Sequence, residues 1–139
     1  MSPQTQAATR QVTGPLLEVT DLRTAFRTDR GLVKSVDGVS FTLDRGKSLG
    51  IVGESGSGKT VLSRSIMGLL PKRNTERSGS VRFEGKEIID LTLKDRRSVW
   101  GREMSMIFQD PMTSLNPVMK VGKQISEGLK IHLGMSKDD

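Results

Sequence analysis

One run of eight residues restricts the fold of this chain more than any other feature of its sequence. Gly53–Thr60 reads Gly-Glu-Ser-Gly-Ser-Gly-Lys-Thr and matches the pattern G-x-x-x-x-G-K-[ST], which joins a buried strand to a helix. The sequence supplies both flanks. Ser48–Val52 is a short apolar segment typical of a strand inside a sheet, and from Lys59 to Leu70 apolar residues recur at helical spacing until Pro71. The sequence therefore predicts an α/β fold built around a P-loop.

Each fixed position of this loop has a physical role in holding phosphate. Glycine permits backbone conformations closed to other residues, so successive N–H groups can point into one concavity. The predicted helix adds the positive end of its dipole. The Lys59 ammonium can reach the β- and γ-phosphates, and the Thr60 hydroxyl can ligate a Mg²⁺ ion that bridges them. We therefore expect a nucleotide and Mg²⁺ to be held by the whole loop: Gly53, Glu54, Ser55, Gly56, Ser57, Gly58, Lys59 and Thr60.

Two other interpretations of the loop have to be weighed. The loop could be a Gly/Ser turn that merely links a strand to a helix. Its four fixed positions would match the pattern by chance in fewer than about one chain in a hundred. The motif itself does not choose among kinases, GTPases and transport ATPases. A kinase-like P-loop enzyme stays open because Asp110 follows the apolar run Met104–Phe108, but Gln109 intervenes where the magnesium-binding acid normally stands.

The remaining sequence predicts short strands and helices after a disordered tail at residues 1–14. Alternating or β-branched runs indicate strands, turn-prone dipeptides indicate hairpins, and a four-residue apolar spacing indicates the last helix. The expected elements are strands at Leu16–Val19 and Val33–Leu43, a hairpin of Ser80–Phe83 with Lys86–Ile89, a helix at Leu93–Trp100, a strand at Met104–Phe108, and a helix carrying Val121, Ile125, Leu129 and Leu133.

Composition excludes several classes of protein. The chain of 139 residues has no cysteine, so it has neither disulfides nor thiolate metal sites. Its net charge of +6 is scattered, with adjacent basic pairs only at Lys72–Arg73 and Arg96–Arg97 and no interleaved aromatics, which argues against a nucleic-acid groove. Apolar runs fall far short of the roughly 20 residues that span a bilayer, so we expect membrane contact only through a partner. His132, the single histidine, is expected to be a packed or surface residue rather than a metal ligand.

Several segments, taken in order, resemble the nucleotide-binding subunits of ABC transporters. They are Leu17–Leu22, Phe26, Val39–Phe41, Gly50–Thr60 and Met106–Pro111. The run Gln109–Pro117 is similar to the branch that energises uptake of di- and oligopeptides, with nickel and glutathione importers close by. The resemblance covers about Leu16 to Met135. It implies a P-loop NTPase of the ABC type, with N-terminal antiparallel strands and a P-loop core, forming a partial ATP-binding domain over residues 15–139.

The resemblance also implies roles for two residues outside the loop. Phe26 matches the aromatic residue that stacks on adenine, although a lone strand Phe would more often pack inward. Gln109 matches the glutamine whose amide reaches the Mg²⁺ ion or the attacking water. The alternative is that Gln109 is simply a polar residue at the end of a strand. Together with Lys59, Gln109 is expected to act in catalysis, and the cofactors are expected to be ATP and Mg²⁺.

The family's remaining machinery does not occur in these 139 residues. There is no signature loop of the LSGGQ type, no second acidic strand end with its catalytic glutamate and no switch histidine, so the chain looks truncated and whether it is an enzyme stays open. The full-length parent is expected to be an ATPase driving peptide import at the cytoplasmic face of the membrane. Its expected partners are transmembrane permease subunits, a second ATP-binding subunit and, indirectly, an extracytoplasmic peptide-binding protein. The alternative is a non-catalytic fragment that binds ATP with little or no turnover.

Overall fold

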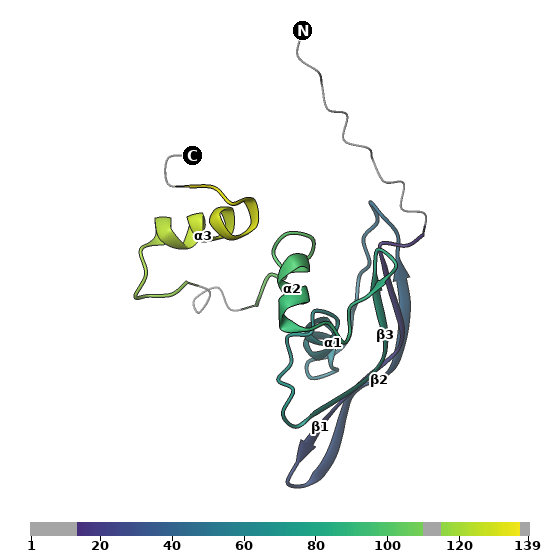
Figure 1. The fold of residues 1–139 in the computed structure, drawn as a ribbon. Coiled ribbons are helices and arrows are strands. Elements are labelled where there is room, and N and C mark those ends of the chain that lie inside the picture. The colour runs from purple at the N-terminus through teal and green to yellow at the C-terminus, as the bar shows by residue number, and fades with distance from the viewer. Residues whose placement is uncertain (1–13, 110–114, 137–139) are drawn as a thin grey trace. The chain divides into compact units, whose positions relative to one another are not determined.

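A computed structural model describes residues 14–109 and 115–136 (Figure 1). The chain divides into two compact units, residues 1–90 and 91–139, and each is described by itself. The predicted tail at residues 1–14 lies outside the described residues apart from Gly14, so its disorder stays a prediction, as does the domain boundary at residue 15. The segment 110–114, which contains Pro111, also lies outside them.

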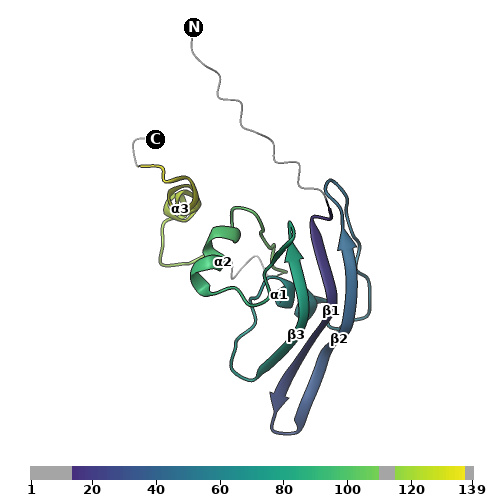
Figure 2. The ribbon, with the colours of Figure 1, turned by 45° about the vertical axis from the view of Figure 1, so that its right-hand side comes forward.

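The first unit is built on an antiparallel sheet with the strand order β2-β1-β3-β4. Figures 1 and 2 show β2, β1 and β3 of this sheet. The strands are β1 at Leu17–Thr28, β2 at Gly31–Leu43, β3 at Thr75–Phe83 and β4 at Lys86–Glu87. The two predicted N-terminal strands are confirmed and longer than expected. The hairpin around Glu84-Gly85 is confirmed too, with a shorter second strand.

Helix α1 at Lys59–Ile66 packs on one face of β1 and β2 (Figure 2). Its apolar side chains Leu62 and Ile66 are buried with residues from the strands and from the segment after β4, which together form the core: Val19, Leu22, Val36, Val81, Ile88 and Ile89. The helix is shorter than predicted because Gly68, with φ 64°, turns the backbone into the left-handed region two residues after Ile66. The position of α1 fixes the position of the loop that precedes it.

Two predicted strands are wrong. Ser48–Val52 and Met104–Phe108 form no strand, apart from an isolated bridge at Met104, and Val52 and Ile107 are 93% and 97% exposed. A short apolar strand needs neighbours on both sides to satisfy its backbone groups and cover its side chains. Among the described residues no segment pairs with either run in this way, so both stay outside the sheet and most of their side chains are exposed despite their apolar composition.

The second unit contains α2 at Leu93–Val99 and α3 at Val121–Leu133, which confirms both predicted helices. Thr92 caps α2 by accepting a hydrogen bond from the Asp95 N–H at 3.3 Å. In α3 no residue is buried, and its predicted apolar stripe is open to solvent. His132 is half-buried, its ring close against Gly101. None of the helices within the described ranges has the length and apolar character needed to cross a membrane.

Candidate functional site

The predicted loop is anchored where it enters α1. Gly58 is the N-terminal boundary residue of the helix and has φ 88°, a left-handed conformation that glycine adopts without strain. A Cβ atom at this position would lie 2.2 Å from the carbonyl oxygen of Ser35 on β2, so a larger residue cannot be accommodated without moving one of the backbones. The close approach of Gly58 to Ser35 therefore holds the end of the loop against the sheet.

The rest of the loop makes close internal contacts and leaves open space beside Gly56. The Ser57 N–H donates to the Glu54 carbonyl at 3.2 Å, and a Cβ at Gly53 would come within 2.7 Å of the Ser57 hydroxyl. Gly56 has φ 81° and faces open space, since nothing lies within 4 Å of where its Cβ would be. Backbone of this kind, with left-handed residues at intervals, forms anion-binding concavities.

The Lys59 side chain folds back over the loop that precedes it. Its Nζ donates to the carbonyl oxygens of Gly53 at 2.7 Å and Glu54 at 2.6 Å, and to the Ser57 hydroxyl at 3.2 Å. All three acceptors are uncharged. Phosphate oxygens would make stronger, charge-assisted hydrogen bonds to the same ammonium. The cation is thus already held at the loop and can exchange neutral partners for anionic ones.

The N-terminus of α1 is chemically suited to nucleotide phosphates with Mg²⁺. Among the described residues it has no side-chain cap and no acidic residue in its first turn, so neither occupies its positive end. Thr60 is exposed in that first turn and brings a hydroxyl of the kind that Mg²⁺ accepts alongside phosphate oxygens. The glycine backbone, the ammonium and the hydroxyl form a donor set that fits such a ligand.

Phe26 lies on β1 close to the part of β2 that meets the loop. It pairs with Val33 on β2, and Val33 is two residues from Ser35, whose carbonyl touches Gly58. Side chains alternate along a strand, so Phe26 shares a face with Thr24, which bonds to α1. Phe26 is only half-buried, which leaves part of its ring accessible. The first unit therefore places Phe26 and the loop near the same hairpin, while the stacking role stays a prediction.

Gln109 belongs to a different unit of the chain from the loop and Phe26. It is exposed and lies in the second unit, directly before the segment 110–114. The geometry of Gln109 toward the loop is not given by either unit, so its predicted contact with Mg²⁺ stays a prediction. Asp110, the acid considered for a kinase-like enzyme, lies outside the described residues.

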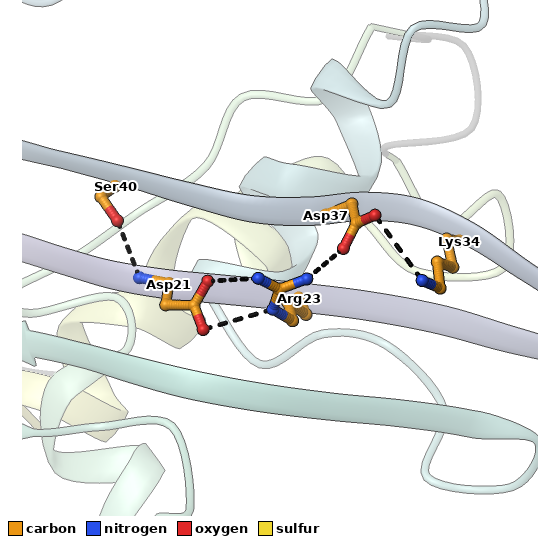
Figure 3. Close-up of polar contacts among 5 residues, drawn as sticks. All are labelled: Asp21, Arg23, Lys34, Asp37 and Ser40. Atoms are coloured by element: carbon orange, nitrogen blue, oxygen red, sulfur yellow. Dashed lines mark hydrogen bonds and ion pairs between the residues drawn. The ribbon is translucent and has the colours of Figure 1, made fainter.

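A polar network that sequence reasoning missed lies on β1 and β2 (Figure 3). Arg23 pairs with Asp21 at 2.8 Å and with Asp37, which also pairs with Lys34 at 3.7 Å. The hydrogen bond and the charge of Asp21, followed by Asp37, raise the pKa of the Arg23 guanidinium above its ordinary value despite partial desolvation. Asp21 itself takes φ 45° at an irregularity of β1, and its N–H donates to the Ser40 hydroxyl at 2.8 Å. The strand register places Arg23 of β1 opposite Asp37 of β2, and composition carries no signal of that pairing.

The network borders a pocket of about 340 Å³ on the sheet. None of the residues predicted to bind a nucleotide lines it. The lining includes Arg23, Ala25, Lys34, Asp37, Glu76 and Ser78. Ala25 follows Thr24 in β1, so its side chain lies on the opposite face from α1 and the loop. The pocket is also lined by Thr24 and Arg77, which form hydrogen bonds to α1.

The comparison with known families and proteins agrees with this geometry. The family described as ABC transporter matches residues 36–138. A putative peptide import ATP-binding protein of Brucella abortus is 48% identical over 123 residues, which cover 88% of this chain and 37% of that protein. The oligopeptide transport ATP-binding protein OppD of Bacillus subtilis is 53% identical over 124 residues, 88% of this chain and 35% of OppD. The dipeptide transport ATP-binding protein DppD of Lactococcus lactis is 49% identical over 125 residues, which cover 89% of this chain and 36% of DppD. The chain thus spans little more than a third of the length of these relatives.

Proposed function

The chain belongs to the ABC transporter family, and from this we propose that it binds ATP with Mg²⁺ as the N-terminal part of a subunit that energises peptide import. The observation that carries the proposal is the Lys59 ammonium, held over the loop by the Gly53 and Glu54 carbonyls beside an uncapped helix N-terminus. This is the place where nucleotide phosphates are recognised in P-loop proteins.

Each residue of the site has a distinct role in this proposal. The loop from Gly53 to Gly58 wraps the phosphates with its N–H groups, and Lys59 pairs with the β- and γ-phosphates. Thr60 and Gln109 would hold the Mg²⁺ ion, which would neutralise charge on the phosphate oxygens. Phe26 offers an aromatic face to the adenine ring.

The substrate and the partners of the parent protein belong to the same proposal. The relatives are named for the transport of oligopeptides and dipeptides, so we expect this subunit to serve an importer of that class. ATP binding would be coupled to transmembrane permease subunits at the cytoplasmic face of the membrane and to a second ATP-binding subunit, with an extracytoplasmic peptide-binding protein acting indirectly.

Turnover by this chain alone is expected to be little or none. Hydrolysis in such domains needs a carboxylate that polarises water and a metal held from two sides. The 139 residues contain no LSGGQ-type loop to close the nucleotide from a second subunit. Binding and hydrolysis therefore have to be measured separately.

Calorimetric titration of the chain with Mg-ATP tests the proposal, with phosphate release followed in the same samples. Lys59→Ala removes the cation at the loop and is expected to weaken binding by about tenfold or more, the cost of a charged hydrogen bond. Lys47→Ala removes the same charge at an exposed turn residue outside the site and is the matched control.

Saturable binding by the wild type and Lys47→Ala, weakened about tenfold or more in Lys59→Ala, with no phosphate release by any of the three, would support the proposal. Folded wild-type protein that binds no Mg-ATP would contradict it. Phosphate release that depends on Lys59 would overturn the expectation of little turnover.

A further inference from the structure

A buried polar cluster joins α1 to the sheet on the face that carries Phe26. The hydroxyls of Thr24 on β1 and Ser65 on α1 lie 2.8 Å apart, and both residues are fully buried. Arg77 on β3, the cross-strand partner of Thr24, donates from Nη1 to the Ser65 carbonyl at 2.9 Å and from Nη2 to the Ile89 carbonyl. One strand pair therefore contacts both the hydroxyl and the backbone of a single residue of α1.

The direction of the hydroxyl bond follows from counting protons. The Ser65 hydroxyl has one proton, and it donates that proton to the Val61 carbonyl at 2.7 Å. With that proton on the Val61 carbonyl, the Ser65 oxygen accepts from Thr24, and this is the arrangement in which both hydroxyl protons have an acceptor. Thr24 is the donor, so the sheet holds the helix through a hydrogen bond of fixed polarity.

This cluster is the second of two close contacts between α1 and the sheet, which lie near the two ends of the helix and add to the apolar packing of Leu62 and Ile66. The first is Gly58, which abuts the Ser35 carbonyl on β2, and Ser65 lies seven residues later, about 10 Å along a helix. The packing of Leu62 and Ile66 holds the helix on the sheet, and close contacts near both ends fix the direction of its axis. The loop moves with α1, and Phe26 moves with β1.

We infer that Thr24, Ser65 and Arg77 are positioning residues that set the separation between the base platform at Phe26 and the phosphate loop. The inference rests on the proposed function, because it concerns the same ATP site. ATP must engage both places at once, whereas inorganic tripolyphosphate needs the loop alone. The cluster should therefore affect affinity for ATP and leave affinity for tripolyphosphate nearly unchanged.

The experiment is a calorimetric comparison of Mg-ATP and Mg-tripolyphosphate on the full chain. Thr24→Val removes the donor and keeps the shape of the side chain, and Thr24→Ser restores a hydroxyl. Thr20→Val, at an exposed position of the same strand, is the matched control. In Thr24→Val we expect the dissociation constant for Mg-ATP, divided by that for Mg-tripolyphosphate, to rise about fivefold or more. This is the low end of the coupling measured between two sites. Thr24→Ser and Thr20→Val should keep the wild-type ratio.

A purely structural role would give a different result. Loss of folded protein lowers the binding stoichiometry for both ligands but leaves the ratio of their dissociation constants unchanged. That result in Thr24→Val would overturn the inference. If Thr24→Val does not fold, Arg77→Lys tests the same cluster from β3, because it removes the forked pair of nitrogens that reach the Ser65 and Ile89 carbonyls, with the same two outcomes. Wild-type protein that binds neither ligand would instead contradict the proposed function, so the two failures are distinguishable.

Discussion

At the scale of single residues, the hydroxyl pair under α1 is unusual because its two ends are not equivalent. Thr24 has Ser65 as the acceptor for its proton, whereas Ser65 also donates to the Val61 carbonyl within its own helix. Removing the Ser65 hydroxyl leaves the buried Thr24 donor without its acceptor. Removing the Thr24 hydroxyl leaves only an unused lone pair on the Ser65 oxygen. Buried donors without partners are the more costly defect.

We therefore predict unequal losses of stability for two substitutions that break the same hydrogen bond. Ser65→Ala strands the Thr24 proton and should lower the free energy of unfolding by ~1–3 kcal/mol. Thr24→Val leaves Ser65 bonded to Val61 and should cost about 1 kcal/mol or less. Urea unfolding followed by circular dichroism measures both.

Ser63→Ala is the control for this comparison. Ser63 makes the same kind of bond to the carbonyl four residues earlier, at 3.1 Å to Lys59, but is only half-buried. Its loss should stay within roughly 0.5 kcal/mol. Equal losses for Thr24→Val and Ser65→Ala would show that the assigned donor direction is wrong.

At the scale of elements, the β3–β4 hairpin depends on one carboxylate for its short second strand. Glu87 accepts hydrogen bonds from the N–H groups of Val81 at 2.9 Å and Ile89 at 3.1 Å, and from the Ser80 hydroxyl. Desolvation raises the pKa of Glu87, but these hydrogen bonds, with that of Ile88, outweigh it and hold the pKa below its ordinary 4.5. The ionised form is thus the one that the hairpin stabilises.

A pH dependence of known sign follows from the lowered pKa. A carboxyl group whose folded pKa lies below its unfolded value contributes stability above the unfolded value, and this contribution is lost as the pH falls through the folded pKa. Relative to Glu87→Gln, the wild type should be more stable at neutral pH. The difference should shrink steadily below about pH 4.5.

Urea unfolding of both proteins across this pH range measures the difference, in which carboxyl groups common to both cancel. Glu18→Gln is a matched control on β1, where the carboxylate lies 3.9 Å from Arg82, and it should change the free energy of unfolding little at neutral pH. A difference between wild type and Glu87→Gln that grows in acid would contradict the assigned direction of the pKa shift.

At the scale of the whole molecule, apolar side chains are distributed very unequally. Leu22 and Val81 in the sheet are completely buried, whereas Ile125 on α3 is 70% exposed and no residue of that helix is buried. Helices gain most of their stability from a packed apolar face. Local opening of α3 should therefore cost much less free energy than opening of the sheet.

Hydrogen exchange followed by mass spectrometry tests this difference. Peptides covering Val121–Leu133 should exchange at least about tenfold faster than peptides covering the centre of β1, which corresponds to ~1.4 kcal/mol of easier opening. Measurement at two protein concentrations is the control, since protection that grows with concentration indicates a second copy covering α3. Equal protection of α3 and β1 at high dilution would contradict the prediction.

Local signals were sufficient for much of the fold and for the centre of the site. The turn residues Thr28–Gly31, the apolar spacing of Val121–Leu133 and the glycine pattern of Gly53–Thr60 each specify backbone conformation over a few residues, so they predict the first hairpin, α3 and the loop with the start of α1 correctly. The same glycine pattern and its flanks, with the resemblance they support, also indicate the family that residues 36–138 match.

Tertiary structure alone decided what depends on partners far away in the chain. Ser48–Val52 and Met104–Phe108 have strand composition and form no strand, because pairing requires a neighbour that no short window of sequence contains. The contacts of Gly58 with Ser35 and of Thr24 with Ser65 join residues 23 and 41 positions apart, and they depend on register and on the placement of α1. The sequence by itself therefore determined the loop that can hold phosphate, and the tertiary structure determined what holds that loop in place.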